Sequence, residues 1–212
     1  MVSKLRIHAI LLLTALLIAA VPAQASKGYG TQIWAATTYV TPLSESQYSA
    51  SGVTQALKAS SEMGYQFGVE FRSGFIGIAF DYLQAKHTFD ASTLALDATF
   101  NPISGTLQLH LPLPVLDLYA GPTVSYVNWG DLKGQLNGTA QIAKVDAKLG
   151  YGFTVGGDLP LGHTLALTSG VRWLKLDATS KALPTTVSVD PLIARLGIAL
   201  DRKSTRLNSS HA

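Results

Sequence analysis

The chain has 212 residues, of which 47% are hydrophobic and 14% are charged, with no cysteine and a formal net charge of +3. Five of its 16 basic residues lie in a leader and a C-terminal tail described below, which leaves 11 basic against 13 acidic residues in the body. A near-neutral body excludes a basic surface for nucleic acid. The absence of cysteine excludes disulfides and thiolate chemistry.

The first 25 residues have the features of a secretory signal peptide. Lys4 and Arg6 precede an apolar run, and small residues follow it up to Ala25. We predict cleavage between Ala25 and Ser26, and one mature domain over residues 26–201. A membrane-anchoring helix is the alternative, but the run is short for a span, and no later apolar stretch is long enough for a membrane helix.

Eight later segments alternate apolar residues with polar or small ones, which is the period of a strand with one apolar face. The longest is residues 57–72, and its length suits a tilted strand that crosses a bilayer better than a soluble strand. In chain order we predict strands at about 31–41, 57–71, 76–83, 103–111, 118–126, 145–155, 165–173 and 192–200.

The connections between these segments alternate between long and short without exception. The short ones are 72–74, 112–117 and 158–163, whereas the other four are longer and rich in polar and turn residues. Outer-membrane barrels have short periplasmic turns and longer external loops. The pattern therefore predicts an all-β fold, an eight-stranded antiparallel up-and-down transmembrane barrel with both termini in the periplasm. A short helix within a long loop stays an open alternative.

A soluble lipocalin-like barrel or a sandwich would also alternate. The charged residues on the less apolar face would then be buried in an apolar core, at a high cost in free energy. In a membrane barrel the same residues face the lumen, where they pair or meet water. We therefore favour the membrane barrel, with a lumen-facing polar set of Glu62, Glu70, Asp81, His110, Asp146, Lys148, Arg172 and Arg195.

Aromatic residues stand near several predicted strand ends, as in the interfacial girdles of membrane proteins, although strands are rich in aromatics in general. The predicted girdle residues are Tyr39, Phe71, Phe75, Tyr82, Trp129 and Trp173. The many glycines at alternate strand positions relieve crowding inside a small barrel.

Three segments resemble the OmpW/AlkL family of small outer-membrane proteins: the hairpin 64–82, the run Leu118–Tyr126, and the segment 187–197 with its Asp190-Pro191 pair. In that family a strand of the form Tyr-x-Gly-x-x-x-x-Tyr follows a periplasmic turn, and a hydrophobic-Asp-Pro motif opens the last strand. The resemblance implies a narrow lumen that admits small hydrophobic molecules and releases them sideways into the membrane. It also implies three partners: outer-membrane lipid, the barrel insertion machinery and periplasmic chaperones.

The lumen departs from the family pattern at Asp81 and Arg172, because bulky apolar side chains are expected at such inward positions. In one alternative, these two residues join Glu62, Lys148 and Arg195 in a salt-bridge network that closes the barrel. Eight strands enclose little more room than their own side chains fill, which favours this alternative. The candidates for an apolar path are Trp34, Leu83 and Leu174.

The C-terminus departs as well. Barrels of this kind commonly finish on an aromatic residue, and the register places Arg202 there. Residues 202–212 are polar and unpatterned, so we interpret them as a non-native or disordered tail and leave them out of the fold.

Catalysis and metal binding have little support in the sequence. His163 with Ser169, and His87 with Asp90, are candidate pairs for a lipid-modifying enzyme, but neither pair has a third member at a fixed spacing. His110 has no partner at metal-ligand spacing. We predict no enzyme and no cofactor. Three hypotheses stay open: a passive conduit for small hydrophobic molecules, a non-conducting barrel that stabilises the envelope or presents its loops, and a lipid-active enzyme.

Overall fold

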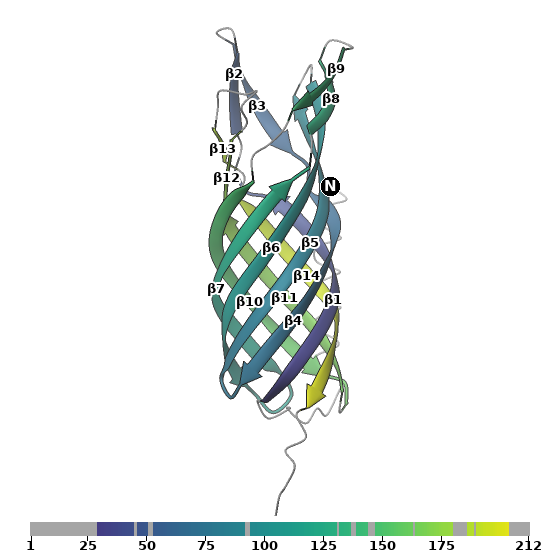
Figure 1. Cartoon of the computed structure of the whole chain (residues 1–212), viewed down its shortest axis with the longest axis vertical. Coiled ribbons are helices and arrows are strands. Elements are labelled where there is room, and N and C mark those ends of the chain that lie inside the picture. The colour runs from purple at the N-terminus through teal and green to yellow at the C-terminus, as the bar shows by residue number, and fades with distance from the viewer. Residues whose placement is uncertain are drawn as a thin grey trace, which may run out of the picture.

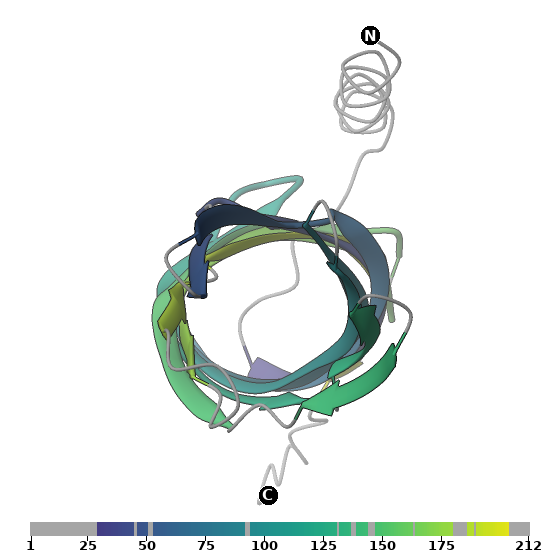
Figure 2. The ribbon, with the colours of Figure 1, turned by 90° about the horizontal axis from the view of Figure 1, so that it is seen from above.

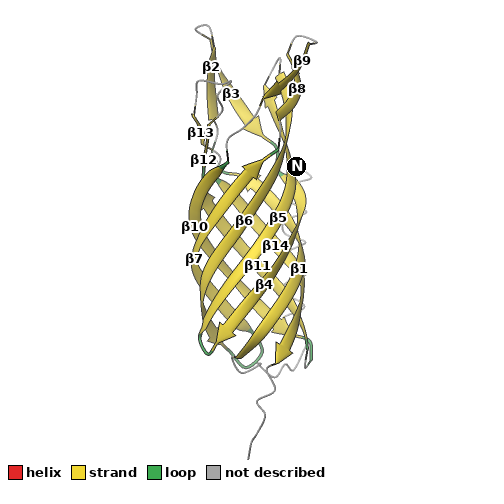
Figure 3. Ribbon diagram, in the orientation of Figure 1, coloured by secondary structure: helices red, strands yellow, loops and turns green. Residues whose placement is uncertain are grey.

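The alternating segments of the sequence pair into one closed antiparallel barrel in the computed structural model (Figures 1 and 3). The structure describes residues 29–44, 46–50, 53–91, 94–130, 132–136, 139–143, 147–162, 164–179, 186–188 and 190–203. Within these ranges no helix is long and apolar enough to cross a membrane. The predicted cleavage site at Ala25 and Ser26 lies outside the described residues, as do residues 204–212.

Eight strands form the wall of the barrel, and each pairs with its two neighbours around the ring. Pairing of the first wall strand with the last closes the barrel, as the view from above in Figure 2 shows. The fold class predicted from the sequence is therefore confirmed. The wall strands, in order, are β1 (Tyr29–Pro42), β4 (Glu62–Ser73), β5 (Ile76–Ala91), β6 (Leu94–Pro112), β7 (Asp117–Trp129), β10 (Lys148–Pro160), β11 (Leu165–Lys175) and β14 (Pro191–Lys203).

Six shorter strands lie in the long connections, at one end of the barrel (Figure 1). They pair as three hairpins: β2 (Ser46–Ala50) with β3 (Val53–Ala59), β8 (Leu132–Leu136) with β9 (Thr139–Ala143), and β12 (Asp177–Thr179) with β13 (Thr186–Ser188). The described parts of these connections thus hold strands where a helix was an open alternative. We call this the hairpin end, and the opposite end the turn end.

The single strand predicted for residues 57–71 is wrong near its start. β3 ends at Ala59 and β4 begins at Glu62, and only β4 pairs along its length with β1. At the break, Ser60 Oγ donates to Glu62 Oε1 over 2.8 Å and accepts from the Thr88 amide over 3.0 Å. The Ser60 amide also donates to the Thr88 carbonyl over 2.8 Å, so the segment stays attached to β5 at the break. The apolar alternation continues across the break and conceals it.

The turn between β4 and β5 needs its glycine. Ser73 pairs with Ile76, so only Gly74 and Phe75 connect the strands, and Gly74 has a φ of 65°. Two-residue hairpin turns require this left-handed conformation at their first central position, where glycine adopts it without strain. The hairpin that resembles the family is therefore fixed locally by one residue.

The outer wall is apolar and exposed along the barrel. Side chains such as Tyr65 (64%), Leu109 (66%) and Phe80 (51%) are largely exposed, although they are large and hydrophobic. A continuous apolar surface of this extent is typical of contact with lipid hydrocarbon. Five of the six predicted girdle aromatics face outward with it: Tyr39, Phe71, Phe75, Tyr82 and Trp173.

The sixth girdle residue is a correction. Trp129 is only 6% exposed and lies inside the lumen, where its ring packs on Phe100 with 5.0 Å between centroids. Odd-numbered residues of β7, such as Tyr119 and Thr123, face inward. β7 extends to Trp129 without a break in this alternation, so Trp129 faces inward as well.

β14 extends beyond the predicted barrel boundary. Arg202 pairs with Thr31 and Lys203 with Gly30, so the strand includes the first two residues of the segment that the sequence assigns to the tail.

Candidate functional site: the barrel lumen

The lumen is filled by two chemically different sets of inward side chains. Toward the hairpin end these are apolar and each is at most 6% exposed, and Leu83 and Leu174 of the predicted apolar path are among them. We call this set the apolar section: Val40, Leu83, Ala85, Phe100, Val127, Trp129, Leu174, Leu176 and Ile193. The central and turn-end parts of the lumen are mostly polar.

An ion pair crosses the middle of the lumen. Arg172 on β11 donates from Nη2 to Asp81 Oδ2 over 2.6 Å and from Nη1 to Asp81 Oδ1 over 2.9 Å. Both side chains are nearly inaccessible to solvent, at 4% for Arg172 and 0% for Asp81. A bidentate ion pair of this kind fixes the orientation of both groups and is stronger than a single charged hydrogen bond.

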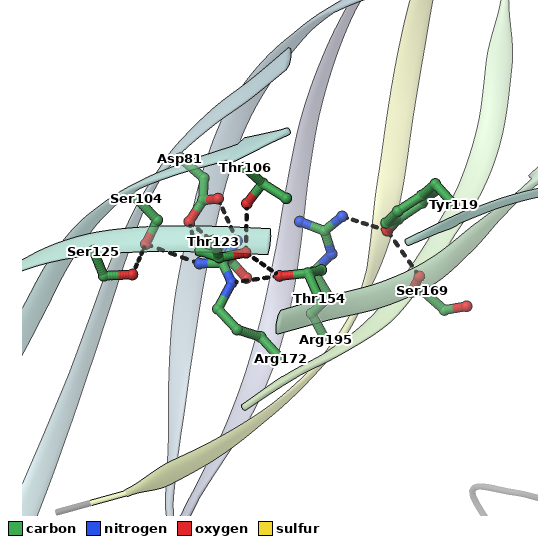
Figure 4. A network of polar contacts seen from close by, with 11 residues as sticks. Asp81, Ser104, Thr106, Tyr119, Thr123, Ser125, Thr154, Ser169, Arg172 and Arg195 are labelled. Carbon is green, nitrogen blue, oxygen red and sulfur yellow. Dashed lines mark hydrogen bonds and ion pairs between the residues drawn. The ribbon is translucent and has the colours of Figure 1, made fainter. Parts of the chain in front are cut away.

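Neutral polar groups give the pair further hydrogen bonds (Figure 4). Gln66 Nε2 donates to Asp81 Oδ1 over 2.7 Å. Arg172 also donates from Nε to Thr154 Oγ1 over 3.0 Å and from Nη1 to Ser104 Oγ over 2.9 Å. Burial of two charges is tolerable only when such partners accompany them. We call these five residues the central polar layer.

Hydrogen bonds between threonine hydroxyls extend the central polar layer along the wall. Thr106 bonds Thr123 over 2.9 Å, and Thr123 bonds Thr154 over 2.7 Å, so three neighbouring strands are joined. A hollow beside the layer, lined by Gln66, Arg172 and Arg195 among others, is too narrow to admit a water molecule. Buried side chains therefore occupy the middle of the lumen at this level.

Trp34, Arg195 and Tyr119 lie together on the turn side of the central polar layer. The Arg195 guanidinium carbon lies 4.0 Å from the Trp34 ring centroid and 5.7 Å from that of Tyr119. Arg195 also donates to the Tyr119 hydroxyl, which in turn donates to the Ser169 carbonyl over 3.1 Å. We call these three residues the aromatic–arginine stack. Trp34 is thus separated from Leu83 and Leu174 by the central polar layer.

A second charged group lies near the turn end. His110 Nε2 lies 3.1 Å from Glu70 Oε1, and His110 Nδ1 lies 3.4 Å from Asp117 Oδ2. Arg72 forms an ion pair with Asp117. All of these side chains are at most 11% exposed, so charged and polar groups occupy the lumen almost to its mouth.

The remaining predicted lumen residues do not join these groups into a single network. Glu62 lies at the start of β4 and accepts from Ser60, and Lys148 is a half-buried residue at the start of β10, both toward the hairpin end. Asp146 lies outside the described residues.

The candidate catalytic pairs are only partly described. The side chains of His87, Asp90 and His163 lie outside the described residues, whereas Ser169 is half-buried and donates weakly to the Gly157 carbonyl over 3.5 Å. No group of three or more His, Cys, Asp or Glu residues in the described part of the chain is placed to hold a metal ion.

Several lumen residues are absent from the sequence-based site, among them Gln66, Ser104, Thr154, Tyr119 and Asp117. Each alternates with outward apolar neighbours and is at most 5% exposed. Strand alternation marks the first four as inward, but an uncharged side chain gives no sign that it bonds a charge on another strand. Asp117 falls in the connection 112–117 that the sequence predicts as a turn.

A closed eight-stranded antiparallel barrel with an apolar outer wall, a filled lumen, short turns at one end and long hairpins at the other has the fold of a small outer-membrane barrel. Solved structures support this assignment. The outer membrane protein OprG from Pseudomonas aeruginosa is similar with a TM-score of 0.72 at 16% identity, over 85% of this chain and 99% of that chain.

Two further structures are similar at comparably low identity. Neisserial surface protein A has a TM-score of 0.58 and 15% identity, over 84% of this chain and 100% of that chain. The outer membrane protein AlkL in lipid bilayers has a TM-score of 0.56 and 19% identity, over 87% and 96%. No protein-family model matches the sequence, and no curated protein matches it either. The resemblance to the OmpW/AlkL family is confirmed at the level of the fold.

Proposed function

We propose that this protein is a Gram-negative outer-membrane barrel that takes up small hydrophobic molecules passively from the outside, while its lumen stays closed to water and ions. The hairpin end faces outward and the turn end faces the periplasm, as in other barrels with this distribution of loops. The main observation in support is the division of the lumen into an apolar section and a central polar layer.

The apolar section provides the chemistry that such molecules require. Burial of apolar ligand surface against Leu83, Phe100 and Leu174 gains roughly 25 cal/mol per Å², without any hydrogen bond that would select one compound. Because these side chains fill the section, a ligand must displace them toward other rotamers. The charged layer beneath would leave the ligand without apolar partners, so release through the wall into lipid is favoured over passage to the periplasm.

Two measurements on the reconstituted protein test this function. We expect no single-channel conductance in planar bilayers, and faster uptake of a hydrophobic fluorescent probe into proteoliposomes than into empty liposomes. Leu174→Asn places an amide in the apolar section and should slow uptake, whereas the outward control Leu109→Asn should not. Uptake at the rate of empty liposomes would contradict the conduit, and steady ion conductance would contradict the closure.

A second candidate function is a non-conducting barrel that presents its hairpins to partners outside the cell. It is favoured by the completely buried apolar section and by the three hairpins that extend beyond the wall (Figure 1). Absence of both conductance and probe uptake in a folded protein would favour this function. On either account the protein depends on outer-membrane lipid, periplasmic chaperones and the barrel insertion machinery, and it is not an enzyme.

A further inference from the structure

We propose that Trp34, Arg195 and Tyr119 form a second closure of the lumen, which excludes small polar solutes on the turn side even when the Asp81–Arg172 pair is absent. This inference rests on the part of the proposed function that keeps the lumen closed to water and ions. It is independent of whether hydrophobic molecules enter from the other end.

The stack reaches most of the circumference of the barrel. Trp34 projects from β1 over its neighbour β4, and Tyr119 projects from β7 over β10 and donates to a carbonyl of β11. Arg195 extends from β14 to both rings. Six of the eight wall strands are therefore covered by three side chains.

Glycines in the wall strands make this close approach possible, because they carry no side chain. A Cβ on Gly68 would overlap the Trp34 indole, and a Cβ on Gly156 would overlap the Tyr119 phenol. A Cβ on Gly170 would lie 3.1 Å from the Tyr119 hydroxyl and 3.2 Å from Arg195 Nε. Since a methyl group does not fit at Gly68 or Gly156 and fits only tightly at Gly170, little space for a hydrated ion remains along these strands.

Polar residues beside the stack fill the lumen in front of the other two wall strands, β5 and β6. On β6, His110 lies 5.6 Å from the Tyr119 ring between centroids, and Gln108 is 2% exposed. On β5, Gly77 has no side chain, and His110, Glu70 and Gln108 occupy the space in front of it. Each of the eight wall strands therefore carries or faces a residue of the stack or of this adjoining polar group.

The two rings of the stack lie on the turn side of the central polar layer, whereas Arg195 also borders the hollow lined by Gln66 and Arg172. Tyr119 precedes Thr123 by four residues on β7, and Thr123 bonds the Thr154 hydroxyl that accepts from Arg172. Four residues correspond to about 13 Å along a strand. A cation between two aromatic rings gains attraction from both, and more where water is excluded. The stack thus has its own source of stability and does not need the ion pair to stay closed.

The absence of cysteine from the chain allows a direct test, because an introduced thiol is unique. Thr106 lies at the turn-side edge of the central polar layer, two residues toward the turn end from Ser104, and is 1% exposed. Thr106→Cys in lipid nanodiscs is treated with a small charged methanethiosulfonate reagent. A thiol at this position reacts only if the reagent passes the stack from one side, or the layer and the apolar section from the other.

We expect no labelling of Thr106→Cys alone, and none when Asp81→Ala and Arg172→Ala are added. Adding Trp34→Ala and Arg195→Ala instead should raise the labelling rate by at least about tenfold, because the cation–π contacts and the hydrogen bond to Tyr119 are lost. Labelling in the Asp81→Ala/Arg172→Ala background would overturn the second closure when the reagent is supplied from the turn end only, in proteoliposomes of one orientation. Continued protection without Trp34 and Arg195 would overturn it as well.

A rescue experiment separates closure from general loosening of the barrel. In Thr106→Cys/Arg195→Ala, millimolar guanidinium chloride should lower the labelling rate again by occupying the space between Trp34 and Tyr119, whereas sodium chloride should not. Each variant must also show the heat-dependent gel shift of a folded barrel. Equal labelling with both salts in a folded variant would contradict the stack. Uptake of the hydrophobic probe is scored separately, so failure of the conduit and failure of this closure give different results.

Discussion

Asp81 and Arg172 form an ion pair between two strands that lie opposite each other in the barrel wall. Three strands separate β5 from β11 in either direction around the barrel, so the pair spans the full width of the lumen. A contact across the centre both blocks the lumen and ties together strands that share no backbone hydrogen bond. Removal of the pair should therefore have two separate effects, one on the closure of the lumen and one on the free energy of unfolding.

The first prediction concerns the stability that this pair provides. Asp81→Ala leaves the Arg172 charge buried without its carboxylate, which should lower the free energy of unfolding by about 3–5 kcal/mol. Arg172→Ala should cost a similar amount. The double variant should lose less than the sum of the two, because neither charge then remains buried and unpaired. Urea unfolding in lipid vesicles measures all three, and strictly additive losses would show that the pair is not coupled.

The second prediction concerns the space that Gly68 leaves for Trp34. Gly68→Ala places a methyl group inside the indole volume and should cost about 1–3 kcal/mol of folding free energy. The three nearest atoms all belong to the Trp34 side chain, so adding Trp34→Leu should recover most of the loss. Gly105→Ala is the matched control, because its Cβ would meet only Phe80 at 3.7 Å or more. A penalty of equal size at Gly105 would contradict a specific fit between Gly68 and the indole.

The periodicity of the sequence predicted which face of each wall strand turns inward, and it did so correctly for Asp81, Arg172 and Arg195. It could not predict their partners. Arg172 meets Asp81 on the opposite strand, but Arg195 meets Trp34 and Tyr119 instead of a carboxylate. These choices depend on the stagger of all eight strands around the barrel, which no local pattern contains.

The errors in the sequence analysis also have physical causes. Trp129 was assigned to the outer girdle because aromatics at strand ends are common there, although its own parity places it inside. The break at residues 60–61 was missed because alternation continues while the pairing partners change. Backbone pairing is non-local, and side-chain alternation carries no information about it.

The third prediction explains the Asp190-Pro191 motif. Asp190 accepts from Lys175 Nζ over 2.8 Å and from the Leu176 amide over 3.2 Å, and its own amide donates to Ser44. Asp190 thus joins three strand ends at the hairpin end: its carboxylate holds the end of β11, and its backbone amide holds the segment after β1 next to the start of β14. Asp190→Ala should speed hydrogen exchange of the Leu176 amide by about tenfold, since it removes one charge-assisted hydrogen bond.

Asp190→Asn keeps an acceptor for that amide but loses the ion pair with Lys175. Exchange at Leu176 should therefore stay closer to the native rate than in Asp190→Ala. Unchanged exchange in both variants would show that the carboxylate does not hold the end of β11.

The last prediction tests which side of the wall meets hydrocarbon. Phe80 is 51% exposed on the outer face of β5, next to Asp81 of the central polar layer, and its cross-strand neighbours Val69 and Gly105 also belong to long wall strands. Phe80→Arg places a charge at the depth of the bilayer centre and should cost about 2–4 kcal/mol, whereas Leu113→Arg in the short connection after β6 should cost about 1 kcal/mol or less. Unfolding in vesicles measures both variants. On the surface of a soluble barrel, exposed arginines at both sites would be nearly neutral, at about 0.5 kcal/mol. Equal and small effects would therefore contradict the membrane assignment. Only a surrounding bilayer makes the free-energy cost of an exposed arginine depend on its position along the wall.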